Sequence, residues 1–77
     1  MDNVRNTTSA AHQNILRRLG WQCQKYRIER GYTQKDVAAD VGMHPSAISR
    51  FENGRANTLI IYQWYLDKGF TYDPIGG

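Results

Sequence analysis

The chain has 77 residues, a length that leaves room for one small domain but not for a second hydrophobic core. Ten Lys and Arg residues against seven Asp and Glu residues give a net charge of +3, and this balance suits a polyanionic partner. A single cysteine excludes an internal disulfide and suits a reducing cytoplasm. No apolar run approaches membrane-spanning length, and the polar start lacks the apolar stretch of a signal peptide.

A flexible N-terminal arm is expected over residues 1–8, which are polar. A helix is predicted from about residue 9 to about residue 30. Its apolar positions recur at helical spacing and are Ile15, Leu16, Leu19, Cys23 and Tyr26. Gly20 makes a bend in this helix possible. The helix also carries several basic residues, of which Arg17 and Lys25 are best explained as parts of a solvated outer face.

Residues 31–54 predict two short helices joined by a tight turn. Thr33 is placed to cap the first helix, and Asp36 follows three positions later, where a carboxylate can accept from exposed amides. The apolar positions Val37, Ala38 and Val41 then form one stripe. Gly42 is expected to end the helix in the left-handed conformation, so a β-carbon there would strain the turn.

The second short helix is predicted to begin at Pro45, where the missing amide of proline costs nothing. Ile48 and Phe51 are expected to point inward. The positions left facing outward are Ser46, Ala47, Ser49 and Arg50. The small residue Ala38 would let the two helices cross closely.

A loop is expected over residues 54–57, and a further helix from Leu59 to Lys68 that ends at Gly69. This helix is apolar almost all the way round. We expect Leu59, Tyr62 and Leu66 to fill the core, which leaves other apolar residues for contact with a second chain. These expected dimer contacts are Ile60, Ile61, Trp64 and Tyr65. The alternative is that the small core takes most of these residues. The tail from Phe70 is predicted to have no regular secondary structure.

The ordered set of small, turn, apolar and polar residues in residues 31–54 resembles the lambda-repressor-like, Cro/repressor-type helix-turn-helix domains. The resemblance covers roughly residues 19–70, and it includes the closing run Ile-Ser-Arg-Phe-Glu-Asn-Gly at residues 48–54. It implies an all-α, lambda-repressor-like bundle of four or five helices. The implied organisation is an arm at 1–8, a helix-turn-helix DNA-binding domain at 9–70 and a tail at 71–77. The loop before the last helix is shorter than is usual in this family, which leaves the mode of dimerisation open.

The resemblance also implies which side chains contact DNA, because the second short helix of such domains enters the major groove. The expected base contacts are His44, Pro45, Ser46, Ala47, Ser49 and Arg50. The expected phosphate contacts are Thr33, Gln34, Lys35, Asn53 and Arg55. The alternative for each of these side chains is that it only faces solvent and contacts no DNA. This alternative explains Gln34, Ser46 and Asn53 as a set less well than it explains His44.

The residues show no pattern typical of catalysis, and neither a cofactor nor a metal site is expected. Two functions are consistent with the sequence. The first is a transcriptional regulator, such as a phage or mobile-element repressor or Cro-like protein, that binds an inverted-repeat DNA operator as a homodimer in the cytoplasm, at the nucleoid. The second is an antitoxin-type protein-interaction module on the same scaffold, with a toxin or antirepressor as its protein partner.

Overall fold

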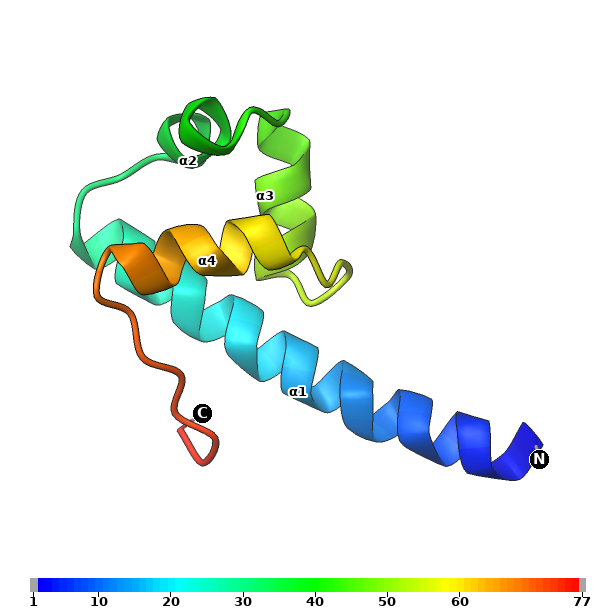
Figure 1. Cartoon of the computed structure of the whole chain (residues 1–77). Coiled ribbons are helices and arrows are strands. Elements are labelled where there is room, and N and C mark those ends of the chain that lie inside the picture. Colours follow the sequence, from blue (N-terminus) through cyan, green and yellow to red (C-terminus); the bar gives the residue numbers. More distant parts are fainter. Residues whose placement is uncertain (1, 77) are drawn as a thin grey trace.

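The computed structural model describes the backbone of residues 2–76 and the side chains of residues 10–76. This part of the chain is all-α, as predicted, and contains four helices and no strand. They are α1 (Asp2–Glu29), α2 (Gln34–Val41), α3 (Pro45–Glu52) and α4 (Leu59–Asp67). Figure 1 shows α2 at the top of the molecule and the long α1 below it, with α3 and α4 in the space between them. Within the described residues, no helix is both long enough and apolar enough to cross a membrane.

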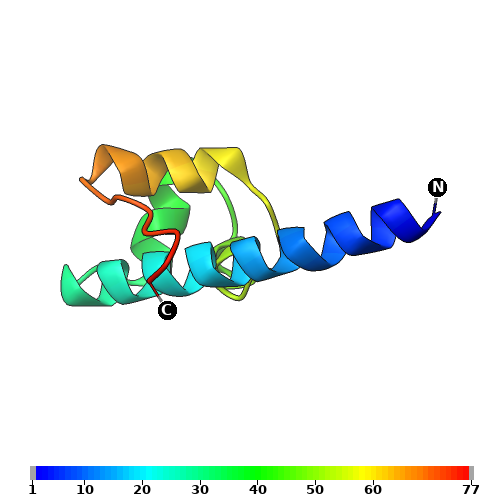
Figure 2. The ribbon, with the colours of Figure 1, turned by 90° about the horizontal axis from the view of Figure 1, so that it is seen from below.

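Helix α1 is 28 residues long, and it begins at Asp2 instead of near residue 9. The loose arm expected over residues 1–8 is therefore corrected, because its described backbone is helical. No glycine or proline interrupts the sequence there, so nothing local ends the helix. Figures 1 and 2 both show that the N-terminal part of α1 projects beyond the other helices.

Gly20 is the point at which α1 meets the end of α3. A β-carbon added at this glycine would lie 2.5 Å from the carbonyl oxygens of both Phe51 and Glu52. Such a distance is far inside van der Waals contact, so a side chain here would force the two helices apart. Gly20 lies within one uninterrupted helix. Its role is therefore close helix packing, not the bend that the sequence made possible.

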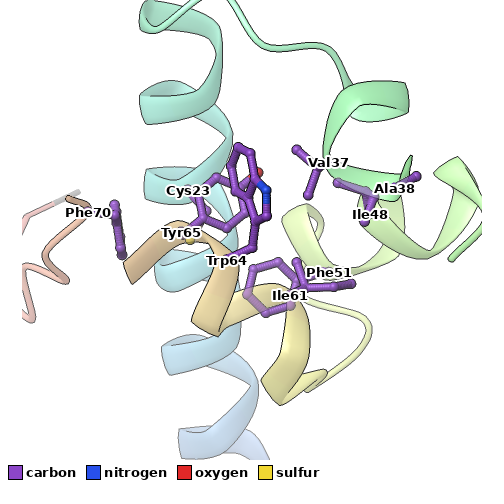
Figure 3. Close-up of a cluster of buried hydrophobic side chains, with 9 residues drawn as sticks. All are labelled: Cys23, Val37, Ala38, Ile48, Phe51, Ile61, Trp64, Tyr65 and Phe70. Carbon is purple, nitrogen blue, oxygen red and sulfur yellow. The ribbon is translucent and has the colours of Figure 1, made fainter. Parts of the chain in front are cut away.

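The hydrophobic core gathers side chains from all four helices and from the tail, as Figure 3 shows. Its buried members are Cys23, Val37, Ala38, Ile48, Phe51, Ile61, Trp64, Tyr65 and Phe70. Cys23, Val37 and Ala38, all from the predicted apolar stripes, are buried, and the prediction that Ile48 and Phe51 point inward is confirmed. Burial raises the pKa of the Cys23 thiol, so this cysteine is an inert core residue.

Helix α4 packs through a different face from the one predicted. Ile61, Trp64 and Tyr65 are buried, so the expectation that they contact a second chain is wrong. Their spacing places them on one side of the helix, and the Trp64 indole Nε1–H also donates to Asp40 Oδ2 at 2.8 Å. Leu59, expected in the core, is 73% exposed, and Leu66 is exposed as well. Among the four expected dimer contacts only Ile60 is exposed.

The tail has no helix of its own, but it is fixed along α1. Phe70 enters the core, and the Tyr26 hydroxyl donates to the Lys68 carbonyl at 2.7 Å. The Gln22 amide donates to the carbonyls of Asp73 (2.7 Å) and Gly76 (3.0 Å) and accepts from the Asp73 amide at 2.9 Å. The side chain of Gln22 thus replaces the backbone partners that an irregular segment lacks.

Candidate nucleic-acid interface

The start of α2 forms the capping box that the sequence predicts. Thr33 Oγ1 accepts from the Asp36 amide at 3.1 Å, and the Thr33 amide donates to Asp36 Oδ2 at 2.8 Å. The hydrogen bond that the Thr33 amide donates lowers the pKa of Asp36, because it favours the ionised carboxylate. The entry into α2 is therefore fixed by local chemistry.

The turn between α2 and α3 has the predicted geometry. Gly42 is left-handed, with φ 71° and ψ 36°, and its amide donates to the Ala38 carbonyl. A β-carbon at Gly42 would meet nothing within 4 Å. Glycine is therefore required at this position by the left-handed backbone conformation and not by lack of space. Pro45 occupies the first turn of α3, as predicted.

Helix α3 has one buried face and one open face. Ile48, Phe51 and Glu52 are buried. Ser46 and Arg50 are exposed on the opposite side, whereas Ala47 and Ser49 are half-buried. Ala47 packs partly against the core, so less of it faces outward than the sequence predicts.

His44 is the N-cap of α3, a role that the sequence reading did not assign. Its Nδ1 accepts from the Ser46 backbone amide at 3.1 Å and lies 2.9 Å from Ser46 Oγ. The side chain is exposed at the start of the helix. Histidine is not among the preferred N-caps, so composition gave no signal for this contact.

An ionic network at the centre of the domain connects the helices to one another. Glu52 is buried and accepts from Arg27 Nε at 2.7 Å, from Arg27 Nη2 at 3.0 Å, from Gln34 Nε2 at 3.1 Å and from the Tyr65 hydroxyl. The hydrogen bond to Glu52 raises the pKa of Arg27, so the guanidinium stays charged. Burial, together with the hydrogen bond to Glu52, raises the pKa of Tyr65 and keeps its hydroxyl protonated as a donor.

This network orients Gln34, which was predicted to contact phosphate. One hydrogen of the Gln34 amide is engaged by Glu52, and the second is free to donate elsewhere. The same hydrogen bond brings the start of α2 to the end of α3, where Asn53 follows Glu52. Asn53 Nδ2 donates to the Ser49 carbonyl at 2.8 Å and so closes α3. Gln34 and Asn53, far apart in sequence, thus lie at one end of the α2–α3 unit.

The remaining predicted phosphate contacts, Thr33, Lys35 and Arg55, are exposed. Pro45, a predicted base contact, is half-buried. Arg27, which acts on the candidate interface only through Glu52 and Gln34, was not among the predicted site residues. Its signal was its position four residues after Cys23, on the same face of α1 as the apolar stripe.

Two short helices joined by a left-handed glycine, the second presenting an open polar face, define the helix-turn-helix class. A comparison with protein families agrees, because residues 24–60 match the family model described as helix-turn-helix. This part of the chain is a helix-turn-helix domain of the lambda-repressor-like family. The family suggests a DNA-binding transcriptional regulator and is typically non-enzymatic. No curated protein and no solved structure matched the chain in the corresponding comparisons.

Proposed function

We propose that this protein is a sequence-specific transcriptional regulator of the repressor or Cro-like type, carried by a phage or mobile element, that binds an inverted-repeat operator as a homodimer at the nucleoid. The observation that carries the proposal is the open face of α3, which Ile48 and Phe51 hold in place from behind. A helix presented in this way fits the major groove, where each base pair offers a distinct set of donors and acceptors.

The base-reading surface in this proposal lies on α3 and its N-cap. Ser46 and Arg50 are exposed, and each has polar atoms available to a base edge. A guanidinium suits the two acceptors of guanine. The remaining members contribute through their outer atoms and are His44, Pro45, Ala47 and Ser49.

The phosphate-binding surface lies at the start of α2 and beyond the end of α3. The first amides of α2 point out of the helix, and the positive end of the helix dipole favours an anion there. The Gln34 amide, held by Glu52, adds a donor in a fixed orientation. The exposed cations Lys35 and Arg55 supply charge near this surface, with Thr33 and Asn53 as polar neighbours.

The DNA-binding proposal is tested by selecting bound sites from random duplex DNA. We expect the parent protein to enrich a palindromic sequence. Ser46→Ala and Arg50→Ala should each weaken binding to that site by about 1–3 kcal/mol. Gln13→Ala, a change at an exposed position of α1, is the matched control and should bind as the parent does. A library without an enriched sequence would refute the proposal.

The dimer proposal now depends on the first turn of α4. Leu59 and Ile60 are adjacent, apolar and exposed, and large exposed apolar groups of this kind mark contact surfaces. A symmetric dimer would place two copies of α3 about 34 Å apart, one turn of duplex, so that two half-sites are read together. In sedimentation velocity we expect Ile60→Glu to convert a dimer into a folded monomer, and Gln13→Glu, at an exposed position of α1, to stay dimeric. A parent protein that is monomeric both free and on DNA would contradict the dimer.

An antitoxin-type role is the second candidate. It is favoured by Trp21 and Ile28, which are exposed seven residues apart on α1 and lie on one face of the helix. A toxin gene beside the gene for this chain would support that role, whereas a divergent repressor gene would support the first.

A further inference from the structure

We infer that the start of α3 reads DNA with a fixed hydrogen-bond polarity: His44 donates to a base through Nε2–H, and Ser46 accepts from a base amino group through Oγ. The inference rests on the proposed DNA-binding function and adds to it the chemical groups that the operator must present. It follows from two contacts between His44 and Ser46.

The first contact fixes the tautomer of His44. Nδ1 accepts from the Ser46 backbone amide at 3.1 Å, and that amide always carries its hydrogen. A hydrogen on Nδ1 would point at the amide hydrogen, so Nδ1 is unprotonated. A neutral imidazole has one hydrogen, which must then be on Nε2. Because His44 is exposed at the end of α3 that enters the groove, it presents a donor there.

The second contact fixes the hydroxyl of Ser46. Its Oγ lies 2.9 Å from the same Nδ1. Since Nδ1 carries no hydrogen, a hydrogen bond at this distance is one that the hydroxyl donates to the ring, and it shares the single lone pair of Nδ1 with the Ser46 amide. A serine hydroxyl has a single hydrogen. Ser46 therefore has none left for DNA, and its outward capacity is that of an acceptor.

These assignments limit the partners on DNA. In the major groove the amino groups are adenine N6 and cytosine N4, whereas the acceptors are purine N7, guanine O6 and thymine O4. Ser46 is complementary only to the first set, and His44 only to the second. An unconstrained serine would pair with either set, so the cap turns a permissive residue into a selective one.

The test asks whether the loss of binding caused by removing one side-chain group depends on the presence of one group on a base. The probes are duplexes of the selected site in which base analogues remove one amino group or one acceptor at a time, for example 7-deazapurine for N7. We expect removal of one amino group to weaken parent binding by about five- to tenfold, and Ser46→Ala to be insensitive to that removal. His44→Ser, which can still cap α3, should be insensitive to the removal of one acceptor.

Two further variants serve as controls. Glu29→Gln, at an exposed position of α1 outside the base-reading surface, should keep the sensitivity of the parent to both removals. His44→Asn retains a cap and an outward amide donor. Its binding should therefore again be weakened when the acceptor on the base is removed. Circular dichroism melts verify that each variant is folded.

The inference is overturned if Ser46→Ala proves coupled to an acceptor instead of an amino group, or to no base group at all. It is equally overturned if the binding free energy lost in His44→Ser simply adds to that lost on removal of each acceptor, because the two groups would then not interact. A random library that enriches no sequence has a different meaning, because it would remove the proposed function and this inference together.

Discussion

Replacing Glu52 by glutamine tests whether the buried network holds the domain together. The carboxylate accepts two hydrogen bonds from Arg27, one from Gln34 and one from Tyr65. Glutamine keeps one acceptor oxygen, but its amide hydrogens would face groups that are themselves donors. The variant would also leave the charge of Arg27 buried without a counter-ion. Breaking a buried pair in this way costs about 3–5 kcal/mol.

That cost is large for this domain. Small domains unfold with roughly 5–15 kcal/mol, and one of this length belongs toward the lower end. Urea unfolding at 25 °C and pH 7, followed by tryptophan fluorescence, should therefore show that Glu52→Gln keeps only about 0–2 kcal/mol of stability, so that its unfolding transition begins near zero denaturant. Glu29→Gln, the same change at an exposed position, should stay within about 0.5 kcal/mol of the parent.

A second variant covers the case in which Glu52→Gln gives no folded baseline. Tyr65→Phe removes a single donor from the carboxylate and should cost about 1.5–3 kcal/mol, the usual range for a hydrogen bond to a charged group. If Glu52→Gln lost less than about 1 kcal/mol, or Tyr65→Phe matched the parent, the network would not carry the stability assigned to it.

Three other outcomes follow from the packing. Gly20→Ala should lower the melting temperature more than Gly42→Ala, because the first meets backbone atoms whereas the second adds only left-handed strain of about 1–2 kcal/mol; equal melts would contradict this. Trp64→Glu should give the circular dichroism spectrum of an unfolded chain, because Trp64 is buried; a cooperative melt would show that this residue is not part of the core. The hydrogen bond from the Thr33 amide lowers the pKa of Asp36, so its stabilisation is complete above the ordinary value of 3.8 and is lost as the pH falls through the lower folded value. Asp36→Asn should flatten that acid part of the stability profile in urea titrations, and an unchanged profile would argue against the capping box.

The helix-turn-helix unit could be predicted from sequence because its determinants are local. Thr33, Asp36, Gly42 and Pro45 each act within a few residues of their own position, through caps and backbone conformation. The same reasoning predicted the inward direction of Ile48, since only one side of so short a helix can face the core.

The packing face of α4 could not be predicted in this way. When apolar residues surround a helix, their periodicity has no preferred direction, and Leu59 competes on equal terms with Ile61. The outcome depends on partners from other helices, such as Asp40, which accepts the indole hydrogen of Trp64.

The buried pair of Arg27 and Glu52 was hidden for a related reason. Charged side chains face solvent unless a partner compensates for their burial, and here the partners are 25 residues apart. The capping role of His44 was not predicted, because histidine is not a preferred N-cap and the contact depends on the orientation of its ring.

The close approach at Gly20 also limits where α1 can change in length. Gly20 and Arg27 are seven residues apart, nearly two full turns, so both face α3. One residue inserted between them would rotate Arg27 by about 100° and turn its guanidinium away from Glu52. The exposed stretch at residues 10–14 has no such partner within the described part of the chain, so a residue inserted there changes only the length of the projecting segment. Tolerance to insertion should therefore change abruptly along a helix that looks uniform, and the boundary lies near Arg17, whose Cα would be 2.8 Å from a β-carbon at Gly54.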